Sequence, residues 1–345
     1  MSFGIPVRNG LGVGLSASTF LSSSRVGGRP AMFLNFIGAT ALDSRITFTR
    51  TTTATVTGSN GVIQSSAINA PRFDYNPVTL APQGLLVEEP RINLLLNSLI
   101  DGTSLSTQNV TVAAVAHTIS FYGTGTITLT GAYVATVTGT GAYPNRQTLT
   151  FTPVVGVLIC AVTGSVQYAQ LEAGGFATSF IPTAGTATTR AIDLASMTGT
   201  NFSSWYDQTQ GSFVVSVSTF GSGANRFALG VSNGANSERI VLFATATSTL
   251  RYIVTDGNVS QADISLAGMN VNVVNKIACA YQANSFNCAL NGTLGSGDTA
   301  GTLPTPDKLF IGSDASGVAP INGRVRSVAY YNTRLPNATL QTLTT

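Results

Sequence analysis

The sequence predicts an all-β protein, and three observations lead to that fold class. Residues that favour surface helices are scarce, because the 345 residues include only two lysines and four glutamates. Thr, Ser, Gly, Val and Ala dominate, a composition that suits strands and turns better than helices. Short apolar runs alternate with Gly-, Pro- and Asn-rich turns over most of the chain.

The N-terminal third predicts an extended arm followed by a β-rich connector. Residues 1–30 are rich in Gly and Ser and lack periodicity, so we expect an arm that becomes ordered only against a partner. Within the connector, residues 31–98, "RITFTRTTTATVTG" and "GVIQSSAIN" flank "GSNG" and predict a β-hairpin. The following "NAPRFDYNPVTLAPQG" is a run of turn signals around a short aromatic strand.

The rest of the chain predicts two β-sandwiches. Residues 99–185 contain short β runs separated by Gly and Thr-Gly turns, which is typical of a small jelly roll. Residues 186–204 are polar and predict a linker. Residues 205–345 hold a longer strand series and predict a second, larger sandwich. Near its end, Pro336 is placed to open one short helix.

Composition also bounds the partners of the chain. The net charge of +3 comes mostly from single arginines without a basic run, so we expect no nucleic-acid partner. No stretch approaches ~20 continuous apolar residues, so we expect no membrane span. The run "GLGVGLSASTFLSSS" is broken by Gly and Ser, which argues against a secretion signal. Low charge favours association, and we therefore expect a homo-oligomer.

The three cysteines predict buried thiols rather than a disulfide framework. If "KIACAYQANSFNCALNG" forms a hairpin, Tyr281 faces Phe286 and Cys279 faces Cys288. Alternation then places both cysteines on one apolar face as small core residues. A strained cross-strand disulfide is the alternative. Cys160 is expected to be a third buried thiol.

Charge concentrates between Arg45 and Ser98, where two of the four glutamates are adjacent. Adjacent residues of a strand point to opposite faces, so this pair is poorly placed to flank a glycosidic bond. We interpret the charges instead as a structural ion-pair network that fixes a turn-rich segment, since the planar guanidinium suits such pairing. Its predicted members are Arg50, Arg72, Asp74, Glu88, Glu89 and Arg91.

No catalytic residue is predicted. The only histidine, His117, lies in the strand-like "AVAHTISFY", and the chain has no G-x-S-x-G motif. The sequence therefore excludes most hydrolase chemistry, and with a single histidine a metal site of the His and Cys type is disfavoured as well.

Aromatic and acidic residues supply the candidates for ligand contact. Trp205 and Tyr206 are candidates for stacking on a sugar, but a single tryptophan at the start of a domain is more often a packing anchor. The same applies to Tyr122, Tyr133 and Tyr143 in the middle region. Oxygen ligands for Ca²⁺ would come from aspartates on predicted loops, but no dense acidic loop is present, so we expect no cofactor. These aspartates are Asp256 and Asp314, with Asp298 and Asp307 nearby in sequence.

The C-terminal strand series resembles a known fold. The segments "KIACAYQANSFNCALNG", "LFIGSDASG" and "NGRVRSVAYYNTRLPNATLQTLTT" resemble the late strands of the concanavalin A-like, or laminin-G-like, jelly roll. The resemblance covers residues 205–345. It implies a lectin-like sandwich for this region.

The connector resembles a segment of tailed-bacteriophage virion proteins. It runs from "LDSRITFTRTTTATVTGSNG" to "GLLVEEPRINLLLNS", and in those proteins it precedes jelly rolls of the carbohydrate-binding-module type. The stretch "YAQLEAGGFATSFIPTAGTATTRAID" resembles the closing strand and linker of such a module. The resemblance implies a virion protein, assembled in the host cytoplasm, such as a tail fibre, head fibre or capsid decoration.

From this resemblance we expect a non-enzymatic structural protein whose residues 1–98 attach to other virion proteins. Such projections commonly form trimers, and the C-terminal sandwich would contact host-surface carbohydrate. One alternative is a decoration or adaptor protein without glycan affinity, because a sandwich fold alone does not establish sugar binding. The other is a polysaccharide depolymerase, which requires paired carboxylates that this acid-poor chain does not suggest.

Overall fold

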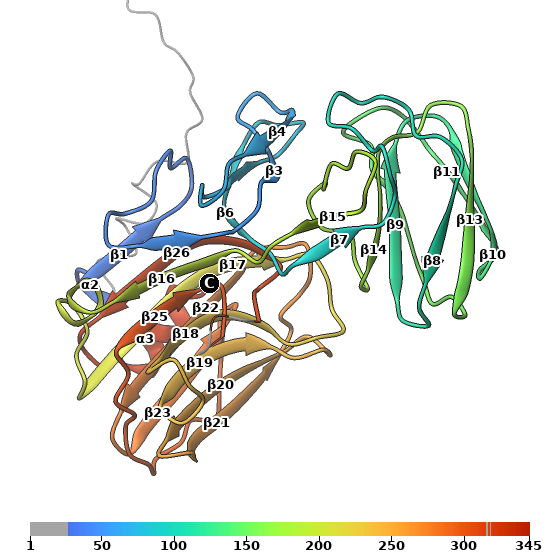
Figure 1. Cartoon of the computed structure of the whole chain (residues 1–345). Coiled ribbons are helices and arrows are strands. Elements are labelled where there is room, and N and C mark those ends of the chain that lie inside the picture. The colour runs from blue at the N-terminus through green and yellow to red at the C-terminus, as the bar shows by residue number, and fades with distance from the viewer. Residues whose placement is uncertain (1–26, 315–316, 318) are drawn as a thin grey trace, which may run out of the picture.

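The computed structural model describes residues 27–314, 317 and 319–345, and strands make up most of its regular structure (Figure 1). The predicted all-β fold class is confirmed. The arm expected over residues 1–30 lies almost wholly outside the described residues. Two sandwiches of different size lie side by side in Figure 1, with a short hairpin above the larger one. None of the described helices is long and apolar enough to cross a membrane.

The larger sandwich packs two antiparallel sheets face to face. The first sheet runs in the order β24 (Thr293–Leu294), β23 (Ser285–Leu290), β22 (Asn275–Gln282), β17 (Gln210–Thr219), β26 (Gly323–Tyr331), β6 (Pro82–Val87) and β5 (Phe73–Tyr75), and β1 (Met32–Asn35) also pairs with β26. The second runs in the order β2 (Thr47–Thr49), β16 (Leu194–Thr198), β25 (Lys308–Ile311), β18 (Arg226–Ser232), β19 (Arg239–Ala244), β20 (Thr249–Asp256) and β21 (Val259–Ala267).

Alternation of apolar and polar residues decides which side chains enter the core of this sandwich. Along β20, Leu250, Tyr252 and Val254 are buried between the sheets while their neighbours are less buried. The outer face of the first sheet is covered by helix α3 (Asn337–Leu343), whose Leu340 packs on alanines of β22 and β23. This helix follows Pro336, as predicted.

The predicted cysteine hairpin is confirmed in register. Cys279 pairs with Cys288, and Tyr281 pairs with Phe286, across β22 and β23. Both cysteines are free and fully buried in the core of the larger sandwich, and Cys160 is also a free buried thiol. Burial raises the pKa of the Cys160 thiol to about 11. These thiols act as small core residues.

The smaller sandwich occupies most of the range 99–185. One sheet runs in the order β11 (Ala135–Thr138), β10 (Thr126–Gly131), β13 (Gly156–Thr163) and β8 (Gln108–Val112). The other runs in the order β12 (Gln147–Phe151), β9 (His117–Tyr122) and β14 (Gln167–Ala173). It has a hydrophobic core of its own, separate from that of the larger sandwich.

Two short strands connect the sandwiches. The chain enters the smaller sandwich through β7 (Arg91–Asn93) and leaves it through β15 (Thr188–Arg190), and these two strands pair with each other (Figure 1). The predicted hairpin around "GSNG" is present as β3 (Ala54–Thr57) and β4 (Ile63–Ser66). Helix α2 (Thr200–Ser203) follows β16.

The domain boundaries drawn from sequence differ from the strand pairing. Residues 31–98, expected as a separate connector, supply β1, β2, β5 and β6 to the larger sandwich. The expected linker, 186–204, holds β15 and β16, and β16 lies between β2 and β25 in the second sheet. These strands are three to six residues long. Strands so short have little periodicity, so pairing with distant strands decides their place.

Gly84 shows how closely the connector packs on the sandwich. It lies in β6 with a φ of +117°, and a Cβ there would lie 2.4 Å from the carbonyl oxygen of Val325. Only glycine permits both the backbone angle and the approach. The register that results places Asp74 of β5 opposite Gly84, and Leu86 opposite Arg324 of β26.

Candidate functional site

Five charged side chains meet in the interior where the connector, the two sandwiches and the expected linker join. Arg50 contacts Asp193 at 3.0 Å, Arg72 contacts Glu88 at 2.8 Å and also contacts Asp193, and Arg190 contacts Glu88 at 3.1 Å. All five side chains are fully buried. We call Arg50, Arg72, Glu88, Arg190 and Asp193 the buried ion-pair cluster.

Hydrogen bonds complete the buried ion-pair cluster and join it to the smaller sandwich. Ser179 donates its backbone N–H and its hydroxyl to Glu88, at 2.7 and 2.6 Å. Arg72 donates to the Ser179 hydroxyl at 2.7 Å and to the carbonyl of Thr55 at 2.9 Å. Arg190 donates to the carbonyl of Glu89 at 2.7 Å. Buried charges are tolerated only when they are paired in this way.

Neighbouring charges of the buried ion-pair cluster favour the ionised forms of Glu88 and Arg72. Burial alone would raise the pKa of Glu88, but Arg190, Arg72 and the bonds from Ser179 lower that pKa to about 2. Burial also opposes the charge of Arg72, yet Asp193 and Glu88 outweigh it and raise the pKa of Arg72 above its ordinary value. The buried carboxylate Glu172 lies close by, accepting hydrogen bonds from Thr178, which Arg190 also contacts.

The structure divides the six residues predicted as one network into three groups. Arg50, Arg72 and Glu88 belong to the buried ion-pair cluster. Glu89 pairs with Arg91, whose Nε lies 2.6 Å from the glutamate oxygen. Asp74 pairs with Arg324, which lies 250 residues further along the chain, at 2.6 Å.

Arg190 and Asp193 were missed by the sequence prediction. They lie in "TTRAID", within the range expected to be a linker. Two charges three residues apart are unusual in a chain with 9% charged residues. The closeness of these two charges indicated a structural role. Their partners, however, lie about a hundred residues or more away in sequence and could not be assigned without the fold.

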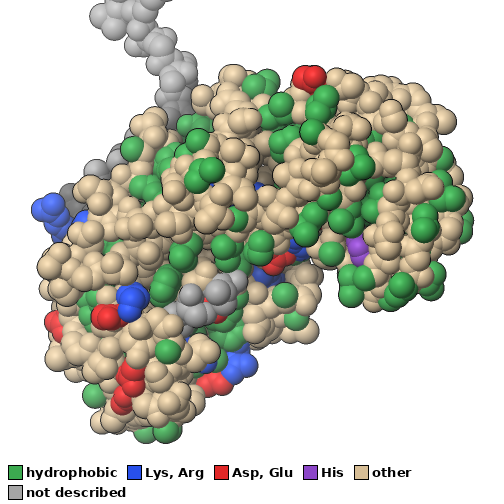
Figure 2. Space-filling model, in the orientation of Figure 1, with side chains coloured by type: hydrophobic (Ala, Val, Ile, Leu, Met, Phe, Trp, Pro, Cys, Tyr) green, Lys and Arg blue, Asp and Glu red, His purple; other side chains and the backbone are tan. Residues whose placement is uncertain are grey.

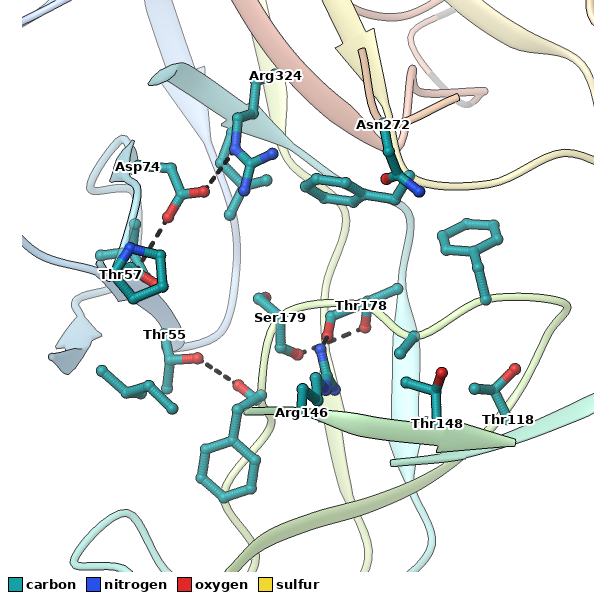
Figure 3. A pocket seen from close by; sticks show the side chains of 18 of the residues that line it. Thr55, Thr57, Asp74, Thr118, Arg146, Thr148, Thr178, Ser179, Asn272 and Arg324 are labelled. Carbon is teal, nitrogen blue, oxygen red and sulfur yellow. Dashed lines mark hydrogen bonds and ion pairs between the residues drawn. The ribbon is translucent and has the colours of Figure 1, made fainter. Parts of the chain in front are cut away.

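A cleft of ≈ 460 Å³ opens between the hairpin, the smaller sandwich and the larger sandwich (Figure 3). The hairpin and β5 contribute Thr57, Asp74 and Tyr75, and the larger sandwich contributes Phe220 and Arg324. The smaller sandwich contributes a wall of aromatic and hydroxyl side chains: Tyr122, Tyr143, Thr118, Thr148 and Thr150. Of the three tyrosines suggested for sugar contact in the middle region, two therefore lie in this cleft.

Two arginines face the cleft from opposite walls. Arg146 of the smaller sandwich donates to the carbonyl of Thr178 and to the hydroxyl of Ser120, both at 2.7 Å. Arg324 of β26 reaches toward Asp74, and its guanidinium lies 4.7 Å from the centre of the Phe220 ring. Figure 3 shows both arginines and Asp74 around the open centre. The cleft thus combines aromatic faces, hydroxyls and fixed cations.

Trp205 lies inside the larger sandwich, in the packing role that is the more common one for a single tryptophan, and not at a sugar contact. Its ring is 7% exposed, lies 5.0 Å from the rings of both Phe202 and Tyr330, and donates its N–H to the carbonyl of Asn201. Tyr206 stacks on Phe202 at 4.6 Å and packs against the same core. A ring enclosed on both faces has no surface for a sugar, so the packing alternative holds for Trp205.

The other candidates are placed as follows. Among the described residues, no three acidic, histidine or cysteine side chains are grouped so that they could hold a metal ion. Asp256 accepts a hydrogen bond from Thr302, and Asp307 pairs with Lys308 at 2.8 Å. Burial lowers the pKa of Arg239, and the nearby carboxylate of Asp314 opposes that shift. His117 is buried, with its Nδ1 2.8 Å from the carbonyl of Val115, which is a structural setting.

Neutralising one member of the buried ion-pair cluster is expected to destabilise the fold strongly. Glu88→Gln leaves Arg72 and Arg190 short of a buried counter-charge, so we expect a loss of about 3–5 kcal/mol in the free energy of unfolding. Asp263→Asn, which breaks the half-exposed Arg251–Asp263 pair, is the control and should cost less than about 1 kcal/mol. Urea unfolding measures both, and equal losses would contradict the prediction.

The same cluster predicts a loss of stability in acid. The pKa of Glu88 falls from an ordinary 4.5 to about 2 on folding, so the folded state favours its ionised form. The stability that ionised Glu88 gives to the folded state is complete above about pH 4.5 and is lost as the pH falls toward 2. The difference in urea midpoint between the unsubstituted chain and Glu88→Gln should therefore narrow between pH 5 and pH 2. A difference that stays constant over this range would refute the assignment.

Comparison with known proteins agrees with the C-terminal fold. Residues 206–341 match a family model described as the concanavalin A-like lectin/glucanases superfamily. No curated protein sequence matches the chain significantly. Solved structures similar to the chain include the CBM40 module of the Ruminococcus gnavus IT-sialidase bound to alpha2,6 sialyllactose, with 19% identity and a TM-score of 0.37. That match covers 42% of this chain and 88% of the module.

Two longer structures match at similar levels. The NanB sialidase of Streptococcus pneumoniae is 13% identical, with a TM-score of 0.36, and the match covers 43% of this chain and 26% of the sialidase. The Trypanosoma rangeli sialidase is 15% identical, with a TM-score of 0.34 and coverages of 44% and 25%. Similarities this low give no information on what the chain binds. Residues 206–341 form a concanavalin A-like lectin/glucanase domain.

Proposed function

We propose that this chain is a non-enzymatic structural protein of a bacteriophage virion and that it contacts host-surface carbohydrate. The cleft beside the concanavalin A-like domain carries the carbohydrate part of the proposal. It brings tyrosine rings, threonine hydroxyls and arginines of three chain segments around ≈ 460 Å³, a volume within the range of ligand sites. The virion part is supported by the resemblance of the segment from Leu42 to Ser98 to tailed-phage proteins.

The cleft replaces Trp205 as the place of sugar contact. Its aromatic side chains include Tyr75, which has no aromatic partner in the described part of the chain and is half-buried. A ring with a free face stacks on the C–H surface of a sugar, while neighbouring hydroxyls pair with sugar hydroxyls. The larger sandwich contributes Phe220 and Arg324, so the contact remains with the C-terminal domain.

The acidic content of the cleft supports a binding role without catalysis. Asp74 is the only carboxylate among its lining residues, and it is already paired with Arg324. Glycoside hydrolysis ordinarily requires two carboxylates on opposite sides of the scissile bond. The lining residues include no histidine that would act as an alternative base.

A role in assembly without glycan binding is the second candidate, and one surface favours it. Val154 and Val157 of the smaller sandwich both bond through their backbones to Ala132, two residues before Val134. Val134, Val154, Val155 and Val157 are 50–76% exposed. Figure 2 shows hydrophobic side chains gathered on this part of the molecule and few charges beside them. Exposed apolar surface of this kind is typical of a contact with another protein, here another copy in a homotrimer or a further virion protein.

The virion assignment is tested on intact particles. Antibodies against residues 99–185 should decorate purified particles of the phage that encodes this chain when viewed by immunogold electron microscopy. Labelling of a tail or head projection supports the proposal. Particles that lack the chain by mass spectrometry would refute it.

The carbohydrate assignment predicts that Tyr75→Ala lowers glycan affinity by about tenfold, because stacking of an aromatic ring contributes roughly 1–2 kcal/mol. Binding is measured on an array of host-surface oligosaccharides with the full chain, since residues 205–345 alone lack β1, β2, β6 and β16. Phe33→Ala, at an exposed aromatic outside the cleft, is the control and should bind as the unsubstituted chain does. Absence of binding to every glycan would leave only the assembly role.

A further inference from the structure

We infer that the cleft takes a carboxylate-bearing sugar and that Arg324 recognises its carboxylate. This inference rests on the proposed carbohydrate function and names the class of glycan. It depends on the placement of Arg324, on the balance of charge around the cleft, and on the hydroxyl side chains of the opposite wall.

Arg324 is held by two contacts that leave its outer edge available. Its Nε donates to Asp74 at 2.6 Å, and its guanidinium carbon lies 4.7 Å from the centre of the Phe220 ring. Together these contacts fix both the direction and the plane of the group. Its two terminal nitrogens, Nη1 and Nη2, have no hydrogen-bond partner among the described residues, and the side chain is 24% exposed.

The free edge of Arg324 has the geometry for a carboxylate. Nη1 and Nη2 point the same way and donate two parallel hydrogen bonds, which match the two oxygens of a planar carboxylate. Asp74 cannot use this edge, because it is bound at Nε and its other oxygen accepts the backbone N–H of Thr57 at 3.2 Å. The pair with Asp74 therefore orients Arg324 without occupying the whole of its donor set.

The charge around the cleft also favours an anion. Arg146 and Arg324 line it, and Asp74 is its only acidic residue, so the lining carries one excess positive charge. Behind the wall, the three arginines of the buried ion-pair cluster are balanced by Glu88, Asp193 and Glu172, so this region adds no net charge. A ligand carboxylate would neutralise the excess within the cleft.

The opposite wall supplies partners for the rest of a sugar. Thr148 and Thr150 are exposed on β12 and line the cleft, together with Tyr143. Arg146 is fixed by Thr178 and Ser120, and its Nε has no partner. Alternate residues of one strand, such as Thr148 and Thr150, point to the same face. The Thr150 hydroxyl is bonded to that of Thr118 at 2.9 Å and to the carbonyl of Gly175, so the Thr148 hydroxyl is the one suited to pair with a hydroxyl of a pyranose ring.

The experiment compares acidic glycans with their neutral forms on the full chain. The probes are oligosaccharides that carry uronic or sialic acid, the same molecules as methyl esters, and sulfated oligosaccharides without a carboxylate. We expect at least one acid to bind, and its ester to bind about tenfold or more weakly, because a charge-assisted bidentate pair is lost. Sulfated probes should bind no better than the esters.

Variants of Arg324 identify the residue responsible. Arg324→Gln should reduce affinity for the acid to that for the ester, and Arg324→Lys should restore only part of it, since lysine keeps the charge but loses the fork. Arg251→Gln removes a similar half-exposed arginine, paired with Asp263 and outside the cleft, and should leave binding unchanged. Thermal unfolding of the variants checks that each is folded.

Each outcome decides between the two levels of the proposal. Equal binding of acid and ester, or binding of neutral glycans alone, overturns the carboxylate inference but leaves carbohydrate binding in place. Equal binding of sulfated and carboxylated probes overturns the specificity for carboxylate. Loss of binding in Arg251→Gln as large as in Arg324→Gln overturns the role of Arg324. No binding to any glycan overturns both the inference and the proposed function.

Discussion

The buried ion pairs constrain how the chain segments at the centre of this molecule can pack, because each buried charge must lie beside an opposite charge. Glu88 and Asp193 have no access to water, and three arginines from three chain segments supply their counter-charges. Removing the segment that carries Arg190 and Asp193 would leave Arg50 buried without a carboxylate partner, a cost that a folded protein avoids. The buried ion-pair cluster therefore specifies how the connector, the smaller sandwich and the segment 186–204 meet.

The cleft is a consequence of that arrangement. Ser179, which donates to Glu88, belongs to the segment that lines one side of the cleft, and Thr55, which accepts from Arg72, belongs to the hairpin on another side. Because these walls are fixed from behind by buried hydrogen bonds, their side chains are preorganised before any ligand arrives. The cleft lies between the two sandwiches and the hairpin, yet its walls are held by buried bonds as they would be inside one domain.

The proposed carbohydrate contact rests on the side chains that line the cleft and not on the fold of the C-terminal domain. A concanavalin A-like sandwich hosts many functions, and its strands do not by themselves identify a ligand. In this chain, Arg324 of the sandwich meets Asp74 of the connector and faces Thr148 and Tyr143 of the smaller sandwich across the cleft. The side chains that we propose to contact a sugar are therefore divided among three parts of the chain, and an isolated C-terminal domain would lack most of them.

Composition, alternation and turn residues close together in the chain are enough to predict the all-β class, the cysteine hairpin, the "GSNG" hairpin and the short helix after Pro336. The sequence also identified Arg50, Arg72 and Glu88 as structural charges. The fold was needed to show that Trp205 is buried, that Asp193 and Arg190 complete the buried ion-pair cluster, and that Asp74 pairs with Arg324. Burial and ion pairing depend on neighbours far away in sequence, and short strands such as β5 and β16 carry no local pattern that assigns those neighbours.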